Sequence, residues 1–345
     1  MSDYAVYSFM PMVGELVVNQ DARATKFSHD NEIAKPHYYK VTFDNGITTE
    51  MAPTTRGVHL RFSYPTTGDA YLVLDGYTDM SEIKIDPAKR QISGWVNNQR
   101  FVNDSKSFRN YFVVQFDKPF EDYGVWENQK DEVFPQKLDG AGKGYGAFIK
   151  FKKGSKVQAK AASSYISAEQ ALITLNKELG KDKNLEVTKA RGQKTWNEVL
   201  NRIVVEGCTD EQMKTFYSCL FRANLFSRKF YERKENGEPY YYSPYNGKIY
   251  DGYMYTDNGF WDTFRSQFPL TNILHPTMQG RYMNALLAAQ EQCGWLPSWS
   301  SPGETGGMLG NHSISLLADA WAKGIRDFDP VSYTHLRAHE TEADL

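Results

Sequence analysis

The hydrophobic pattern of this 345-residue chain changes its period once, close to Ser167. Before that point, apolar residues alternate or cluster in short runs, such as 70–75 and 111–116, separated by turn residues such as Asn45-Gly46. After it, apolar residues recur every three or four positions. Short punctuated runs are typical of antiparallel strands, and the longer period is typical of amphipathic helices. The sequence therefore predicts an antiparallel β-sandwich followed by a helical domain.

The start of the helical part carries its own local signals. Ser167, with Gln170 three residues later, is typical of a helix N-cap. The polar stretch 177–192 is predicted to be a connecting segment, and Thr195 with Glu198 is predicted to cap a second helix. Further helices are predicted around 213–224, 281–292 and 311–323. These signals divide the chain into a sandwich domain (1–166), a helical linker (167–194), a second domain (195–330) and a tail (331–345).

Composition excludes several classes of protein. The chain has 40 basic and 42 acidic residues, so it lacks the clustered basic excess of a nucleic-acid-binding protein. No stretch of sequence is apolar for long enough to predict a membrane span. The three cysteines, Cys208, Cys219 and Cys293, fit no zinc or redox spacing and are predicted to be buried free thiols.

The stretch 251–270 is the densest in aromatic and charged residues. Trp261 offers a flat face, Asp262 offers two acceptor oxygens, and Arg265 follows one helical turn later. A stacking plane beside charged groups suits recognition of a sugar ring and its paired hydroxyls. An ion pair between Asp262 and Arg265 beside a core tryptophan is the structural alternative, and these residues by themselves favour it.

A second polar stretch runs from 294 to 321. Its Gly-, Ser- and Pro-rich loop carries Trp299 and Glu304, and such loops usually lie at the surface. The helix predicted after the loop places His312, Ser315 and Asp319 on one face. That face either lines a pocket or is a solvated face with a satisfied histidine, and the sequence favours neither explanation.

Three segments together resemble glycoside hydrolase family 92. They are Tyr-Thr-Asp-Asn-Gly-Phe-Trp-Asp-Thr-Phe-Arg at 255–265, the Leu-Pro-Ser-Trp run at 296–325, and Phe-Ser-His-Asp-Asn-Glu-Ile-Ala-Lys-Pro-His-Tyr-Tyr at 27–39. The resemblance implies a β-sandwich joined to the first part of an (α/α)6 barrel. It also implies a mannose-containing glycan as substrate, from which terminal α-linked mannose is removed with inversion and calcium dependence. An α-1,2 linkage in N-glycans or mannans, and a periplasmic or secreted location, complete the expectation.

The resemblance also implies roles for individual residues. Trp261 and Asp262 match positions that line the terminal mannose subsite, Trp299 and His312 match positions near it, and the 27–39 segment faces the cleft. The residues predicted to bind substrate are therefore Trp261, Asp262, Arg265, Trp299, His312, His29 and Glu32. The catalytic acid, the base and most calcium ligands are expected beyond residue 330, so we assign neither Glu304 nor Asp319 to catalysis.

Both ends of the chain depart from the family pattern. The opening strands and the export signal are missing, and 331–345 resembles the translation of a sequencing adapter. We therefore expect an inactive fragment and exclude His335 and His339 from any site. One alternative is a non-catalytic carbohydrate-binding or scaffold protein. Another, a glycoside phosphorylase, is disfavoured by the Trp261-Asp262 motif together with the 27–39 segment.

Overall fold

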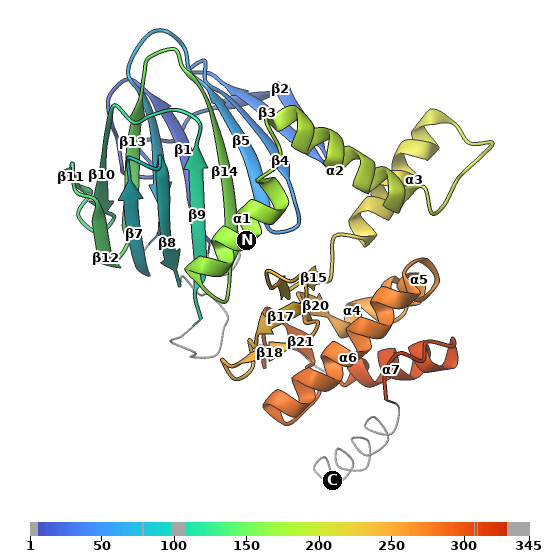
Figure 1. Cartoon of the computed structure of the whole chain (residues 1–345). Helices are drawn as coiled ribbons and strands as arrows, with labels where there is room; N and C mark the ends of the chain where they lie inside the picture. The colour runs from blue at the N-terminus through green and yellow to red at the C-terminus, as the bar shows by residue number, and fades with distance from the viewer. Residues whose placement is uncertain (1–5, 78, 98–107, 307, 309, 330–345) are drawn as a thin grey trace. The chain divides into compact units, whose positions relative to one another are not determined.

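A computed structural model describes residues 6–77, 79–97, 108–306, 308 and 310–329. The chain forms two compact units (Figure 1), and we describe each by itself. Unit 1 comprises 1–100 and 109–199, and unit 2 comprises 101–108 and 200–345. The domain bounds expected from the sequence stay predictions, and the adapter-like tail lies outside the described residues.

Unit 1 is built on two antiparallel sheets. The smaller sheet contains, in spatial order, β1 (Ser8–Val13), β6 (Ala70–Asp75), β13 (Tyr145–Phe151), β10 (Asp122–Glu127) and β11 (Glu132–Pro135). The larger sheet contains, in spatial order, β12 (Asp139–Lys143), β7 (Met80–Asp86), β8 (Gln91–Val96), β9 (Asn110–Phe116), β14 (Lys156–Ser164), β5 (Gly57–Ser63), β4 (Thr48–Pro53), β3 (Tyr38–Phe43) and β2 (Phe27–Lys35).

One hydrophobic core joins the two sheets. Leu72 and Ile149 of the smaller sheet are buried together with Ile83, Phe112 and Val157 of the larger one. Because successive side chains point to opposite faces of a sheet, each predicted strand contributes one of its two faces to this core. The prediction of an antiparallel β domain at the N-terminal side is confirmed.

Helix α1 (Ala168–Leu179) covers part of the outer face of the larger sheet (Figure 1). Its start confirms the predicted N-cap, because the Ser167 hydroxyl accepts a hydrogen bond from the Gln170 amide at 3.1 Å. Ala171 and Leu175 pack on the outward side chains of β9 and β14. The sheet is therefore buried on both faces at this point.

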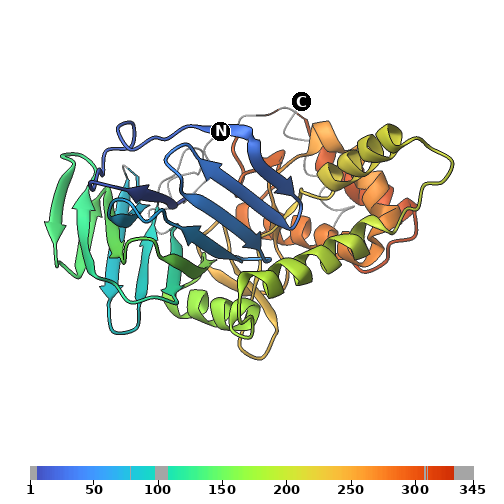
Figure 2. The ribbon, with the colours of Figure 1, turned by 90° about the horizontal axis from the view of Figure 1, so that it is seen from above.

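Helix α2 (Leu185–Leu200) corrects two sequence predictions. It begins inside the stretch predicted to be a connection, and Thr195 is not a cap, because its hydroxyl donates to the Arg191 carbonyl at 3.1 Å within the helix. Only Leu185 and Thr188 of this helix are buried, so its sequence lacks the recurring apolar residues by which an amphipathic helix is recognised. Figure 2 shows its C-terminal part extending beyond the strands.

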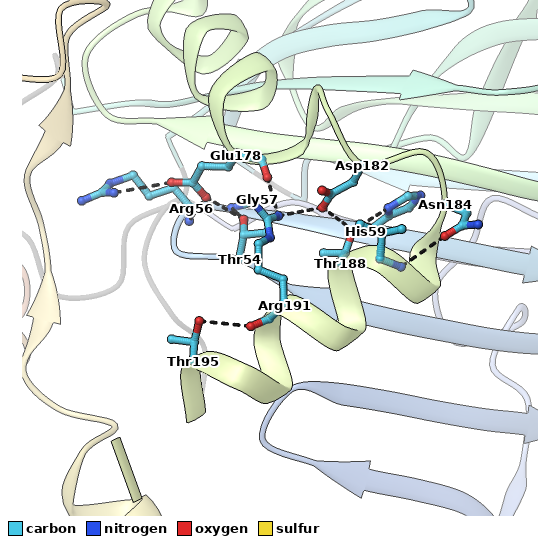
Figure 3. A network of polar contacts seen from close by, with 11 residues as sticks. Thr54, Arg56, Gly57, His59, Glu178, Asp182, Asn184, Thr188, Arg191 and Thr195 are labelled. Atoms are coloured by element: carbon cyan, nitrogen blue, oxygen red, sulfur yellow. Dashed lines mark hydrogen bonds and ion pairs between the residues drawn. The ribbon is translucent and has the colours of Figure 1, made fainter. Parts of the chain in front are cut away.

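A polar network fastens α2 to the sandwich (Figure 3). The buried Thr188 hydroxyl donates to the Asp182 carboxylate at 2.7 Å, so its oxygen accepts from Nδ1 of His59 at 2.9 Å. Arg191 donates to the same Asp182 oxygen at 2.7 Å. Burial lowers the pKa of His59, a residue of β5, to about 4. The imidazole is therefore neutral at ordinary pH.

The C-terminal end of α1 takes part in the same network (Figure 3). One carboxylate oxygen of Glu178 accepts from the Thr54 hydroxyl at 2.6 Å and from the Arg56 amide at 2.9 Å. Gly57 sits where a Cβ would come within 2.8 Å of the Ala161 carbonyl oxygen. The turn between β4 and β5 is thus held closely against α1 and β14.

Unit 2 combines helices with small sheets. The helices are α3 (Asp210–Ala223), α4 (Phe260–Thr263), α5 (Gln267–Leu274), α6 (Pro276–Cys293) and α7 (His312–Ala322). One small sheet pairs β15 (Arg228–Lys229) with β19 (Tyr255–Thr256), and another pairs β20 (Asn258–Gly259) with β21 (Trp299–Ser300). A third has β17 (Pro239–Tyr242) between β16 (Glu232–Arg233) and β18 (Ile249–Asp251). Helices α5, α6 and α7 pack on one another.

The three cysteines differ from the prediction. Cys219 lies exposed on α3, and Cys208 and Cys293 are only partly buried, so the prediction of buried thiols is wrong. Polar neighbours of Cys219 on this amphipathic helix place it on the solvent side. Among the described residues, no helix is long and apolar enough to cross a membrane.

Candidate functional site

A two-residue strand pair organises the candidate site in unit 2. Strand β20 pairs with β21 so that Asn258 faces Ser300 and Gly259 faces Trp299. The Asn258 amide is buried and donates to the Tyr282 hydroxyl at 3.1 Å. Burial raises the pKa of Tyr282 to about 12, so this hydroxyl stays protonated. The pair is therefore attached to α6 by a neutral hydrogen bond.

The residue before this strand has an unusual backbone. Asp257 has a φ of 62°, in the left-handed region that few residues other than glycine adopt. Its carboxylate pairs with the Arg228 guanidinium at 2.8 Å. Such conformations persist where surrounding contacts enforce them, and they concentrate at functional sites. This constrained residue directly precedes the strand that contains Gly259.

Gly259 makes room for two functional groups. A Cβ placed on this residue would lie 2.5 Å from the indole nitrogen of Trp299 and 2.7 Å from Oδ2 of Asp262. Within the described part of the chain, neither of these groups has a hydrogen-bond or ion-pair partner. The neighbouring Trp261 is 47% exposed. A donor, a charged acceptor and an open aromatic face are thus available to a ligand.

Arg265 does not form the predicted structural alternative. No ion pair joins it to Asp262 in the described structure, and its guanidinium carbon lies 5.1 Å from the centre of the Phe264 ring. Both charged side chains are exposed. The carboxylate of Asp262 is therefore free of the arginine that would otherwise neutralise it.

His312 lies at the start of α7 and stacks on Phe264. The ring centres are 4.2 Å apart and the planes differ by 17°. A Cβ at Gly310 would come within 3.0 Å of the imidazole, so the backbone also confines it. Phe264 follows α4 directly, which places His312 close to the helix that carries Trp261 and Asp262. The sequence did not identify Phe264 as the residue that holds His312.

The two other carboxylates of this region are engaged in structure. Asp319 accepts from the Asn272 amide at 2.9 Å and pairs with Lys323 at 2.7 Å, so it joins α5 to α7. Glu304 accepts from the Ser298 amide at 2.6 Å and from the Gly306 amide at 2.9 Å. These contacts support the structural explanation for the polar face of α7 at Asp319.

His29 and Glu32 lie in unit 1, on the edge strand β2. The structure brings them together, with Nδ1 of His29 2.6 Å from one carboxylate oxygen of Glu32. The Tyr39 hydroxyl donates to the other oxygen at 2.5 Å, and this bond, followed by that of His29, lowers the pKa of Glu32. Tyr39 was missed, although β2 and β3 form one hairpin.

The described residues do not by themselves form a calcium site. Within the described ranges, no group of three or more His, Cys, Asp or Glu side chains is placed to hold a metal. Calcium requires six to eight oxygen ligands, most of them from converging side chains and carbonyls. We therefore derive no catalytic step through a metal from these residues.

Comparison with known families identifies the chain. The model of the glycosyl hydrolase family 92 N-terminal domain matches residues 1–164, and that of the family's catalytic domain matches 170–344. The chain belongs to glycosyl hydrolase family 92. Members of this family are glycoside hydrolases, and the resemblance inferred from the three sequence segments is confirmed.

Solved structures of family 92 share the fold. A family 92 inverting mannosidase from Bacteroides thetaiotaomicron is 42% identical, with a TM-score of 0.94 over 98% of this chain and 46% of that one. A family 92 α-mannosidase from the same species, in complex with mannoimidazole, is 23% identical with a TM-score of 0.82, over 96% of this chain and 45% of that one.

A curated relative is more distant. An uncharacterized secreted glycosidase from Arthroderma benhamiae is 22% identical over 68% of this chain and 35% of the relative. The family 92 chain described here therefore spans less than half the length of these relatives.

Replacing Gly259 with alanine is expected to displace Trp299 and Asp262. A methyl group has no space between the indole nitrogen and the carboxylate, and overpacking of this kind costs about 1–3 kcal/mol. The near-ultraviolet circular dichroism of the tryptophans and the midpoint of thermal unfolding measure the effect. Ser266→Ala, at an exposed nearby position, is the control, and equal behaviour of the two variants would contradict the packing described for Gly259.

Proposed function

We propose that the chain is part of a glycosidase that removes terminal α-linked mannose, and that Trp261, Asp262 and Trp299 bind this sugar. The observation that carries the proposal is the open group around Gly259. An aromatic face stacks on the C–H groups of a pyranose, a carboxylate accepts from its hydroxyls, and an indole N–H donates to an oxygen. Few, well-placed polar groups beside aromatic surface are typical of small-molecule sites.

The finer reaction is also a proposal. The similarity to a family 92 inverting mannosidase supports inversion, which requires a carboxylic acid at the leaving oxygen and a carboxylate that activates water, about 6.5–9.5 Å apart. Glu304 and Asp319 already accept structural hydrogen bonds, so we place neither role on them. Calcium dependence and an α-1,2 linkage in N-glycans or mannans belong to the same proposal.

The architecture and location of the protein are proposed on the same basis. We place α3 to α7 in the first part of an (α/α)6 barrel, which the helical packing of unit 2 supports. A periplasmic or secreted location is supported by a relative that is named as a secreted glycosidase.

Binding of a mannose-shaped inhibitor tests the proposed sugar site. Titration calorimetry with mannoimidazole on the full chain is expected to show binding that Trp261→Ala weakens about tenfold, through loss of the stacking face. Asp262→Asn is expected to weaken binding by about ten- to a hundredfold, because hydrogen bonds to charged groups contribute about 1.5–3 kcal/mol. Absence of binding to the wild-type chain contradicts the proposal.

A matched control separates the site from general surface effects. Trp295 is 57% exposed in the same unit and takes no part in the site, so Trp295→Ala is expected to bind the inhibitor as the wild type does. Hydrolysis of an aryl α-mannoside by the same preparation distinguishes an enzyme from the alternative. Binding without hydrolysis favours a carbohydrate-binding protein, or a chain that requires further residues for catalysis.

A further inference from the structure

The loop that carries Trp299 is closed on itself by one carboxylate. Oε2 of Glu304 accepts from the Ser298 amide at 2.6 Å and from the Trp299 amide at 3.4 Å. Oε1 accepts from the Ser298 hydroxyl at 2.9 Å and from the Gly306 amide at 2.9 Å. Both oxygens are therefore committed to donors of the loop itself.

The rest of the loop is fastened to the interior of unit 2. The buried Ser300 hydroxyl bonds with that of Tyr245 at 3.1 Å, and the Thr256 hydroxyl donates to the Pro302 carbonyl at 2.5 Å. Trp299 lies between these attachments and Ser298. Its backbone is held from one side by the buried residues and from the other by Glu304, while its indole reaches Gly259.

We infer that Glu304 is a positioning residue, which clamps the 298–306 loop and so holds the Trp299 indole beside Asp262. The inference rests on the proposed function, because the consequence of the clamp is a preorganised sugar site. A proton-transfer role needs a carboxylate oxygen that faces the substrate, whereas both oxygens of Glu304 face loop amides and a hydroxyl. Preorganisation raises affinity by removing the cost of ordering the loop when the ligand binds.

Loss of the clamp is expected to affect the loop and not the fold of unit 2. Without the carboxylate, the amides of Ser298 and Gly306 lose their acceptor, and the loop keeps its attachments at Ser300 and Pro302. The fold of unit 2 does not depend on these bonds, because its helices pack elsewhere. We therefore expect a local loosening that moves Trp299 and leaves the melting temperature nearly unchanged.

A double-mutant cycle tests whether Glu304 acts through Trp299. Mannoimidazole affinity is measured by calorimetry on the full chain for wild type, Glu304→Ala, Trp299→Ala and the double variant. We expect Glu304→Ala to weaken binding about tenfold in the wild type and to have almost no further effect in the Trp299→Ala background. Equal losses in both backgrounds mean that Glu304 contacts the sugar directly, and no loss means that it positions nothing; either result overturns the inference.

Hydrogen exchange decides the inference without any ligand. The amides of Trp299 and Gly306 are expected to exchange at least tenfold faster in Glu304→Ala, and less so in Glu304→Gln, which keeps one acceptor oxygen. Asp319→Asn changes an acid outside the loop and is expected to leave these amides unaffected. Unchanged exchange overturns the inference even where mannoimidazole binds, whereas faster exchange in a chain that binds no mannoimidazole removes the proposed function and keeps the clamp.

A milder variant covers the case in which Glu304→Ala does not fold. Ser298→Ala removes only the hydroxyl bond to Glu304 and leaves the clamped amides of residues 298, 299 and 306 in place. Exchange at Trp299 is expected to rise about two- to threefold in this variant, and unchanged exchange together with wild-type affinity counts against the clamp.

Discussion

Replacing Asp75 with alanine is expected to lower the free energy of unfolding of unit 1 by about 3–5 kcal/mol. Asp75 is fully buried at the end of β6, and its carboxylate pairs at 2.5 Å with Arg23, whose side chain is itself only 6% exposed. Removal of one member of a buried ion pair leaves the other charge without compensation in a medium of low polarity. This uncompensated charge is the reason for the large effect.

The surroundings of this pair leave the arginine few alternatives. The guanidinium lies 5.5 Å from the centre of the buried Trp126 ring and also donates to the Val18 carbonyl. Asp75 additionally accepts from the Tyr77 amide at 2.8 Å and from the Gln20 side chain. The aspartate therefore connects residues 18–23 to the smaller sheet, and its loss is expected to release that segment as well.

Urea unfolding of wild type and Asp75→Ala measures the loss. Asp69→Ala is the matched control, because Asp69 pairs with Lys150 at 2.6 Å and Lys153 at 3.0 Å at the surface, where solvent screens such pairs and they contribute little to stability. A loss below about 1 kcal/mol for Asp75→Ala contradicts this description of the pair and means that Arg23 reaches solvent when its partner is removed.

Local signals account for the parts of the fold that the sequence predicted. The cap at Ser167 involves atoms of residues three positions apart. In the strands of the sandwich, the alternation of buried and less buried residues is complete within six or seven positions. Such features depend on the immediate neighbours of a residue, so the sequence displays them directly.

Helix α2 could not be predicted from such local signals. Its contacts with the sandwich are mostly hydrogen bonds and ion pairs, such as those of Thr188 and Arg191, and polar side chains produce no hydrophobic period. A polar stretch that packs on a sheet resembles a connection in sequence. His59 on β5 and Asp182 in the connection before α2 hold Thr188 and Arg191, and the segment's own sequence does not display these partners.

The candidate site was predictable in its residues and not in its arrangement. The motif singled out Trp261 and Asp262, which are neighbours in sequence. That Trp299 lies against the same glycine follows from the pairing of β20 with β21, two strands too short to carry any pattern. The proposed role of Glu304 was not predictable either, because a carboxylate that binds amides and one that transfers a proton look alike in a sequence.

The buried His59 is expected to make unit 1 less stable in acid. Its folded pKa of about 4 lies below the ordinary value near 6.5, so the unfolded chain binds the proton more readily than the folded one. The stability is therefore complete above about pH 6.5 and falls as the pH falls from there to about 4. At about 1.4 kcal/mol for each pKa unit, the loss approaches about 3 kcal/mol.

The charged groups around His59 act in both directions. Lys160 is its cross-strand partner on β14. The positive charges of the Lys160 ammonium and the Arg61 guanidinium disfavour a further positive charge on His59. Asp182 and Glu186 favour the charge, and burial outweighs them. Because Nδ1 already carries the hydrogen that it donates to Thr188, a second proton would go to Nε2 and place a charge in the buried contact between α2 and the sheet. Protonation is therefore expected to loosen α2 from the sheet before the sandwich itself unfolds.

Comparison of the wild type with His59→Gln isolates the histidine from the other acids. Glu50 and Glu186, whose pKa values are lowered, also weaken the fold in acid, but they do so equally in both proteins. Urea unfolding at pH 7.0 and about pH 4.5 is expected to show a wild-type loss that exceeds the variant's by about 2 kcal/mol, since a glutamine amide donates to Thr188 without titrating. Hydrogen exchange in residues 185–191 should rise in acid more in the wild type than in the variant. Parallel losses in the two proteins would mean that His59 takes up its proton as readily in the folded protein as in the unfolded chain, and that the acid sensitivity of the α2 attachment resides in its carboxylates.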